Sequence, residues 1–93
     1  VKIKPKSLQR VKANLNVKTD VIIETGEHTD LDDERFTSAV FFVNDNNGYL
    51  RIGDKKIQSK ANTIVFLKSN ILHTGSTCTD ASRRVVINFV YIS

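Results

Sequence analysis

The chain has 93 residues, of which 40% are hydrophobic and 26% charged, and its formal net charge is +4. This length accommodates one small domain, and it excludes a two-domain enzyme or a solenoid of several repeats. No apolar run approaches the ~20 residues of a membrane-spanning helix, so we expect no membrane partner. The chain begins at Val1 rather than Met and shows no signal-peptide pattern. We therefore expect a processed or trimmed piece of a longer protein.

The positive charge is concentrated in the N-terminal third. Its basic residues are Lys2, Lys4, Lys6, Arg10, Lys12 and Lys18. Such an arm suits contact with nucleic acid or another anion, but it equally suits a solvated strand face. No aromatic side chains are interleaved with these cations to stack on bases. We favour the solvated face and expect no nucleic-acid partner.

A single cysteine, Cys78, cannot form an internal disulfide, so the fold does not depend on one. This fits a cytoplasmic protein. Cys78 lies in a polar segment, residues 75–80, without an evident histidine partner, which argues against a nucleophilic role.

The chain is predicted to be all-β. Short runs rich in Val, Ile, Phe and Thr are separated by Asn, Asp and Gly, and helical periodicity is almost absent. The expected strands lie near residues 1–4, 10–15, 21–24, 36–44, 49–52, 55–58, 63–67, 71–74 and 84–92. Tight turns are expected at residues 44–48 and at Gly53-Asp54, and an acidic loop at 26–35. This pattern is typical of a sandwich, barrel or jelly roll.

The last expected strand has two different faces. Alternation places the apolar residues Val85, Ile87, Phe89 and Tyr91 on one face. The other face is mixed, with Arg84 and Asn88 beside Val86 and Val90. If this mixed face points into a barrel, Arg84 needs an anionic partner, because an unpaired buried charge is very costly. Taken alone, the pattern favours a mixed face in solvent, with Arg84 exposed.

The two histidines of the chain are the candidate metal ligands. His28 and Asp30 are two residues apart, so in an extended segment they share a face, and His73 follows a later apolar run. Two imidazoles and one carboxylate are the facial ligand set of non-haem Fe(II) sites. Zinc accepts the same ligands with a water, so the ligand types alone leave the metal open.

The order of these residues resembles that of the Fe(II)- and 2-oxoglutarate-dependent oxygenases, particularly the prolyl-hydroxylase-like branch. The order is His28-Thr29-Asp30, then His73, then an arginine, Arg83 or Arg84, about ten residues later. The flanking segments 41–44, 48–52, 62–67 and 84–89 are also similar to strands of that family. The resemblance extends over about residues 10–91.

The resemblance implies a double-stranded β-helix, the cupin-like jelly roll, as a single domain over residues 1–93. It also implies an Fe(II) centre at His28, Asp30 and His73, with 2-oxoglutarate and O₂ as co-substrates. The reaction would be hydroxylation of a substrate, coupled to decarboxylation of 2-oxoglutarate to succinate. The substrate itself is open, because specificity usually lies in loops and flanking segments.

Arg83 and Arg84 compete for the role of anchor for the far carboxylate of 2-oxoglutarate. The planar fork of an arginine suits a carboxylate. We prefer Arg84 because it shares a strand face with Asn88, while the opposite face is apolar. Asn88 and, as the alternative, Arg83 complete the expected co-substrate residues.

Two features depart from the family pattern. Phe42 stands where relatives often have a tyrosine hydroxyl that contacts the co-substrate, and Lys12, Asn14 and Thr74 are candidate replacements. The helices that brace one sheet in full family members are not evident. Their place would be taken by a missing upstream segment or by an oligomer partner, which would cover the apolar face of the last strand.

Two other functions remain alternatives. A non-catalytic jelly-roll binding module with vestigial metal residues would keep the fold without binding 2-oxoglutarate. A small nucleic-acid-binding barrel would use the basic N-terminal third, with an affinity that falls steeply with salt.

Overall fold

The computed structural model describes residues 7–92, and these form seven strands and no helix. The strands are β1 (Ser7–Val17), β2 (Thr37–Phe42), β3 (Tyr49–Ile52), β4 (Lys55–Gln58), β5 (Thr63–Lys68), β6 (Thr74–Gly75) and β7 (Arg83–Ile92). The prediction of an all-β chain is confirmed. Within these residues no helix is long and apolar enough to cross a membrane.

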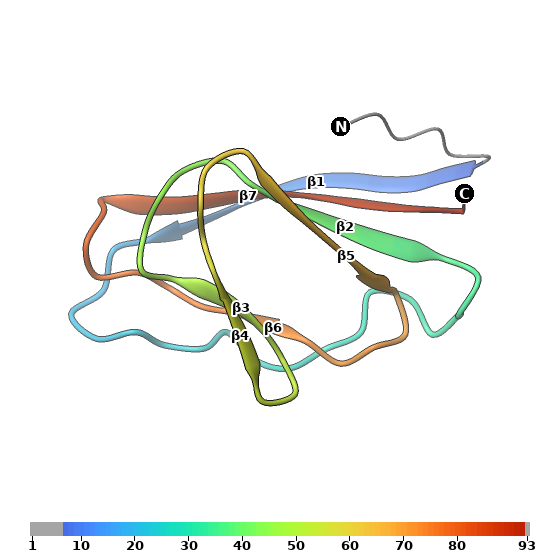
Figure 1. Ribbon diagram of the computed structural model, residues 1–93, viewed down its shortest axis with the longest axis horizontal. Helices are drawn as coiled ribbons and strands as arrows, with labels where there is room; N and C mark the ends of the chain where they lie inside the picture. Colours follow the sequence, from blue (N-terminus) through green and yellow to red (C-terminus); the bar gives the residue numbers. More distant parts are fainter. Residues whose placement is uncertain (1–6, 93) are drawn as a thin grey trace.

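The strands form two antiparallel layers. Four long strands make one sheet in the order β1-β7-β2-β5, and three short strands make the other in the order β4-β3-β6. Figure 1 shows the long strands running together above the short ones, with the chain crossing between the layers several times. Every neighbouring pair is antiparallel, and all pairs except the β3–β4 hairpin join segments far apart in the sequence. Each layer covers the inner face of the other.

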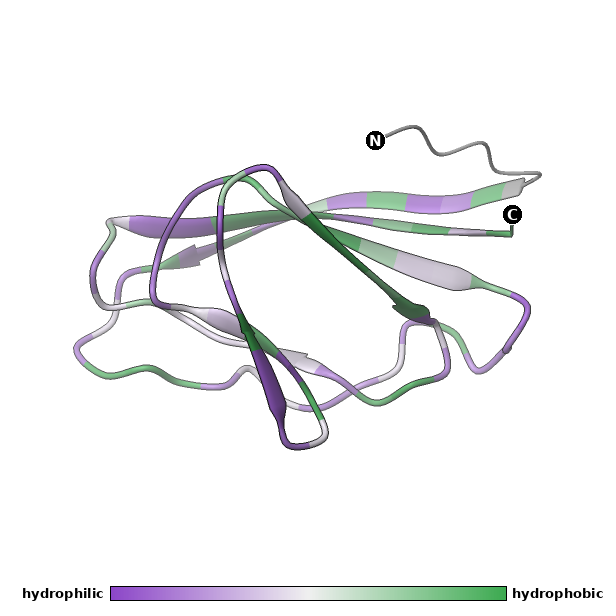
Figure 2. Ribbon diagram, viewed as in Figure 1, coloured by the Kyte–Doolittle hydropathy of each residue, from purple (hydrophilic) through white to green (hydrophobic). Residues whose placement is uncertain are grey.

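The hydrophobic core lies between the two layers. Its buried members come from β2, β3, β5 and β7: Val40, Phe42, Leu50, Leu67 and Val86. Alternation along the strands places these side chains on the inner faces. On β1 the alternation is reversed, because polar residues point inward and apolar ones outward; Figure 2 shows the two classes alternating along this strand.

Most expected strands are present within one or two residues, and those at 49–52 and 55–58 match β3 and β4 in full. The expected strand at 1–4 lies outside the described residues. The expected strand at 21–24 is wrong: this segment has an isolated bridge between Glu24 and Ser76 and a hydrogen bond from the Thr77 amide to the Ile23 carbonyl, but no regular strand, and its apolar residues are exposed. The strand expected at 71–74 begins only at Thr74, because Ile71 closes a turn on Lys68.

The predicted turn at Gly53-Asp54 joins β3 to β4 as a tight hairpin. Gly53 has a φ of 58°, in the left-handed region that glycine enters without steric cost. Asn62 has a φ of 63° before β5, where asparagine is the next most tolerant residue.

The face of β7 that the sequence pattern alone placed in solvent is the buried one. The mixed face points inward: Arg84 is only 2% exposed, and Val86 and Val90 are buried beside it. The apolar face of Val85, Ile87 and Phe89 points outward and is half-buried. The exposed Arg84 that the pattern alone favoured is therefore wrong, and the inward Arg84 preferred from the resemblance is the orientation observed. The reason is that β7 is second in its sheet, between β1 and β2, where the second layer covers its inner face.

We predict that Phe42→Ala lowers the free energy of unfolding by about 3–5 kcal/mol, because the ring is fully buried in the core and its removal leaves a cavity. Urea unfolding followed by circular dichroism measures the loss. Val21→Ala, at an exposed position, is the control and changes stability by less than about 0.5 kcal/mol. Equal effects of the two substitutions would contradict this core assignment.

Candidate metal centre and cavity

The two histidines are brought together by the backbone. His28 and His73 form an isolated antiparallel bridge, in which each amide N–H donates to the other residue's carbonyl, at 2.9 and 3.0 Å. Directly opposed residues project their side chains to the same face, and the ring centroids lie 4.6 Å apart. The bridge thus places two imidazole rings side by side although their residues are 45 positions apart in the sequence.

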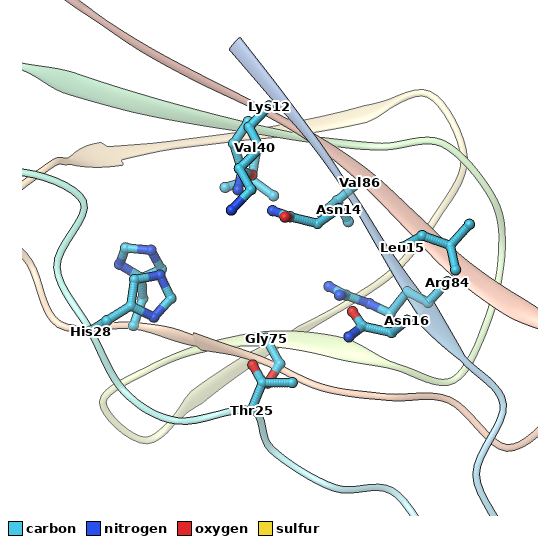
Figure 3. Close-up of a pocket in the computed structure, with 12 residues that line it drawn as sticks. Lys12, Asn14, Leu15, Asn16, Thr25, His28, Val40, Gly75, Arg84 and Val86 are labelled. Atoms are coloured by element: carbon cyan, nitrogen blue, oxygen red, sulfur yellow. The ribbon is translucent and has the colours of Figure 1, made fainter. Parts of the chain in front are cut away.

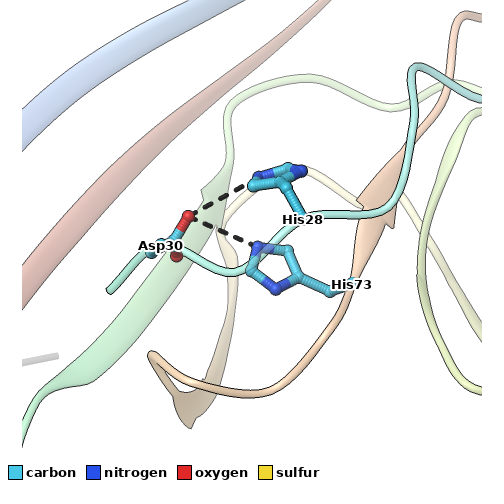
Figure 4. Close-up of side chains that lie close together, drawn as sticks. All are labelled: His28, Asp30 and His73. Atoms are coloured by element: carbon cyan, nitrogen blue, oxygen red, sulfur yellow. Dashed lines mark ion pairs between the residues drawn. The ribbon is translucent and has the colours of Figure 1, made fainter. Parts of the chain in front are cut away.

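Asp30 completes the cluster. Its Oδ1 lies 3.6 Å from His28 Nε2 and 3.5 Å from His73 Nε2. Dashed lines mark the two pairs in Figure 4. One ligand atom from each of the three residues can be chosen within 4.8 Å of the others. The expectation that His28 and Asp30 share a face agrees with these distances.

Ser38 holds the carboxylate of Asp30, and Ser69 supports both residues. Ser38 Oγ donates to Asp30 Oδ2 at 2.5 Å, and the buried hydroxyls of Ser38 and Ser69 lie 2.9 Å apart. The amide of Asp30 also donates to the carbonyl of Ser69. Sequence reasoning missed both serines, because a serine in a β-rich chain carries no pattern that marks it as a partner of a distant carboxylate.

The outer nitrogen of each imidazole is oriented by a carbonyl. His73 Nδ1 lies 2.8 Å from the carbonyl of Ile71, and His28 Nδ1 lies 3.2 Å from that of Gly26. A carbonyl only accepts, so each Nδ1 carries the proton and each Nε2 is left with its lone pair in the neutral ring. This is how metal-binding histidines are usually prepared.

Charge coupling within the cluster shifts the pKa values of Asp30 and His73. Burial acts to raise the pKa of Asp30, but the imidazole of His73 and the hydroxyl of Ser38 outweigh it, so the pKa is lowered. Burial acts to lower the pKa of His73, but Asp30 and the carbonyl of Ile71 raise it above its ordinary value. His28 is the exposed member of the cluster and stands at its open side.

A cavity of about 320 Å³ connects this cluster to Arg84. His28 lies at one end and Arg84 at the other, with Lys12 and Asn14 of β1 above and Thr25 and Gly75 below (Figure 3). His73, whose ring centroid lies 4.6 Å from that of His28, also lines the cavity. Asn16, Val40, Val86 and Asn88 also line it. Of the candidate replacements for the tyrosine hydroxyl, Lys12 and Asn14 therefore face the cavity. Thr74 is buried and donates instead to the carbonyl of Gly75.

Arg84 is a buried cation without a carboxylate partner in the described part of the chain. Its Nε donates to Ser59 Oγ at 2.9 Å and its Nη2 to the carbonyl of Tyr49 at 3.2 Å, and its guanidinium lies 5.8 Å from the ring centre of Phe42. Burial lowers the pKa of Arg84. These neutral partners leave its charge uncompensated.

Gly48 leaves room for the side chain of Arg84, which lies directly against it. A Cβ at this position would lie 2.6 Å from Arg84 Cδ and 2.9 Å from the carbonyl oxygen of Thr77. Sequence reasoning placed Gly48 only in a turn, because close approach by a side chain 36 positions later leaves no mark in the local sequence.

Arg83, the alternative anchor, has an exposed side chain and does not line the cavity. Its carbonyl accepts from Asn44 Nδ2, and Asn44 Oδ1 in turn accepts from the amide of Val85. Asn88 lines the cavity, and its Oδ1 is buried without a hydrogen-bond partner. On β7 the cavity therefore presents a buried guanidinium without a carboxylate partner and a buried acceptor without a hydrogen-bond partner, among the residues that the structure describes.

Comparison with known proteins identifies the architecture. No family model matches the chain, and no curated protein is significantly similar to it. Among solved structures, a cupin protein from Bacteroides fragilis superimposes with a TM-score of 0.68 over 89% of this chain. The chain has a cupin fold. The identity to that protein is 12%, and the chain spans 64% of its length, so the likeness is one of fold.

The cupin assignment confirms the predicted all-β jelly roll. Cupin barrels occur both in enzymes and in binding modules, so function has to be argued from the site. In this structure the site is a His/Asp cluster that could hold a metal ion, and its two histidines line a cavity that Arg84 also lines.

We predict that Asp30→Asn lowers the pKa of His73, because the carboxylate that raises it is removed. NMR titration of metal-free protein measures the shift, and Asp33→Asn, whose carboxylate pairs with Arg35, is the control. The His73 contribution to stability is complete below pH 6.5 and is lost as the pH rises through the raised pKa. The Asp30 contribution is present above pH 3.8 and is lost as the pH falls through the lowered pKa. An unchanged His73 titration in Asp30→Asn would contradict this coupling.

We predict that Gly48→Ala displaces Arg84. The new Cβ overlaps the arginine side chain, so the hydrogen bond to Ser59 is lost. The readout is proton exchange at Arg84 Nε, which is slow in the parent protein and faster in the variant. Gly75→Ala is the matched control, because its Cβ would meet Arg84 Nη1 at 3.4 Å, an ordinary contact. Slow exchange retained in Gly48→Ala would refute the steric role.

Proposed function

We propose that this cupin barrel is a non-haem Fe(II)- and 2-oxoglutarate-dependent dioxygenase. It would hydroxylate a C–H bond of its substrate while 2-oxoglutarate is decarboxylated to succinate and CO₂. The observation that supports this most is that Arg84, a buried guanidinium without a carboxylate partner among the described residues, lines the same cavity as His28 and His73, the two imidazoles of the His28/Asp30/His73 cluster.

The cluster fits Fe(II) by its donor set. His28 Nε2, His73 Nε2 and one oxygen of Asp30 are the facial ligands of this iron class. Asp30 is fixed by Ser38, and each imidazole by a backbone carbonyl, so the ligands are oriented before metal arrives. The iron, once bound, supplies the oxygen chemistry, and the protein supplies orientation and electrostatics.

The far end of the cavity fits the second carboxylate of 2-oxoglutarate. Nη1 of Arg84 makes no hydrogen bond among the described residues, and the whole guanidinium lacks a negative charge near it. A carboxylate there would satisfy both needs through charge-assisted hydrogen bonds. A volume of about 320 Å³ suits a small organic acid and lies at the lower end of ligand cavities.

The walls between these two ends would orient the ligand. Asn14 and Lys12 of β1 present hydrogen-bond donors, which supports them as replacements for the hydroxyl that Phe42 lacks. Asn88 Oδ1 offers an acceptor to a bound water or hydroxyl group. Val40 and Val86 form an apolar part of the wall between the two ends.

We predict that 2-oxoglutarate binds only when a divalent metal is present. Isothermal titration with Mn(II), an inert substitute for Fe(II), should show metal binding in the parent protein and its loss in His28→Ala, Asp30→Ala and His73→Ala. Arg84→Ala should retain metal and weaken 2-oxoglutarate binding by about 10- to 100-fold, the range for lost hydrogen bonds to a charged group. Arg83→Ala is the matched control and should bind as the parent does.

Two outcomes would reject the proposal. A parent protein that binds neither Fe(II) nor Mn(II) has no metal centre. A protein that binds metal but shows no affinity for 2-oxoglutarate is better described as a cupin binding module with vestigial or different metal chemistry.

We also predict succinate formation from 2-oxoglutarate in air, dependent on Fe(II), even before the substrate is identified. Succinate is quantified by mass spectrometry, and Asp30→Ala should abolish it because the only carboxylate ligand is removed. The Asp33→Asn variant should form succinate at the parent rate, since Asp33 pairs with Arg35 at the surface. Equal succinate from the parent protein and Asp30→Ala would contradict an iron-dependent reaction.

A further inference from the structure

Lys12 is a second cation on the wall of the cavity, and solvent reaches it. It lies on β1, whose polar residues Lys12, Asn14 and Asn16 all line the cavity. The side chain of Lys12 is exposed, whereas that of Arg84 is buried. Figure 3 shows Lys12 beside Val40, away from the guanidinium of Arg84. The cavity therefore has one buried cation and one cation that an entering ligand meets first.

The surroundings of Lys12 bring it no negative charge. No acidic residue of the described chain lines the cavity, and Lys12 forms no ion pair within residues 7–92. Asn88 lies directly opposite it on β7, and Val40 lies next to Asn88 on β2. Asp30, the acid of the metal cluster, is engaged by the two imidazoles and by Ser38. A cation placed in this way in a cleft attracts an anion from solvent.

Lys12 and Arg84 mark two separate positions for an anion. In the strand register Lys12 pairs with Asn88 and Asn16 pairs with Arg84, so the two cations are four positions apart, about 13 Å along the sheet. Asn14 lies between them on β1. A small acid whose carboxylate is held by Arg84 therefore leaves Lys12 to a second negative group.

The charges of the proposed site agree with this separation. 2-Oxoglutarate carries two negative charges. Arg84 offers one positive charge, and a divalent metal with Asp30 as its one carboxylate ligand offers one net positive charge. The co-substrate is thereby balanced, so Lys12 is the one cation of the described cavity lining that remains without a counter-charge.

We propose that Lys12 binds the carboxylate of the hydroxylation substrate, and that this substrate is a small organic acid. The inference rests on the proposed function and names the substrate class of the same site. Lys12 and His28 are both exposed, so a molecule from solvent can approach both of them. The volume of about 320 Å³ favours a small molecule. An ammonium group on a flexible stem suits a single carboxylate without imposing a fixed geometry.

Saturation-transfer NMR with pentanoate and its neutral amide, pentanamide, tests this proposal. The two probes share a carbon chain and differ in charge. The parent protein is saturated with 2-oxoglutarate and with Zn(II), which is diamagnetic and takes the same ligand types as Fe(II). Pentanoate should bind about 3- to 10-fold more tightly than pentanamide, as expected for a partly exposed ion pair. The preference should shrink in about 0.5 M NaCl, because salt screens an exposed charge.

Substitution of Lys12 assigns the preference to this residue. Lys12→Gln should remove the preference for pentanoate, and Lys12→Arg should retain it, because arginine restores the positive charge. Lys55→Gln is the matched control, since Lys55 is an exposed lysine on β4 that does not line the cavity, and it should bind both probes as the parent does. Circular dichroism checks that each variant keeps the fold.

The outcomes separate this inference from the proposed function. A parent protein that binds 2-oxoglutarate but binds the two probes equally would overturn this inference alone. A preference for pentanoate that persists in Lys12→Gln would also overturn it, and weaker 2-oxoglutarate binding in that variant would then assign Lys12 to the co-substrate. A parent protein without affinity for 2-oxoglutarate would reject the proposed function, and this inference with it.

Discussion

The burial of Arg84 is the constraint on which much of this small barrel depends. A cation inside a 93-residue β domain needs acceptors, space and, for full compensation, a negative charge. Ser59 and the carbonyl of Tyr49 supply the acceptors, and Gly48 supplies the space. Nothing in the described chain supplies the charge. Residues in and next to β3 and β4 thus surround one side chain of β7, and the uncompensated positive charge of that side chain lies at the cavity.

The candidate metal cluster depends on a different constraint, which is that the side chains of His28, Asp30 and His73 must be brought together from separate segments. One backbone bridge joins His28 to His73, and the amide of Asp30 is tied to Ser69. These few backbone hydrogen bonds replace a regular strand at this edge of the second sheet. The segment can therefore bend, so that His28 stays at the open side while Asp30 turns inward onto Ser38.

The fold was predictable to a large extent because its signals are local. Runs of β-branched and aromatic residues mark β2, β5 and β7, and Gly53-Asp54 marks the β3–β4 hairpin. The apolar segment 21–24 has the same local composition, yet it is not a strand, because strand formation also requires a partner along its length. The ligand residues were predictable from type and order, whereas Ser38, Ser69, Ser59 and Gly48 act on residues far away in the sequence and carry no local mark.

The sequence by itself determined the all-β class, most strand positions and the small set of residues able to bind a metal. These follow from side-chain chemistry and from the two-residue period of a strand. Only the tertiary structure decided which face of β7 is inside, that Arg84 rather than Arg83 enters the cavity, and that the apolar side of the large sheet faces outward. The physical reason is that alternation defines two faces but does not say which one a second layer will cover; the pairing of β7 between β1 and β2 does.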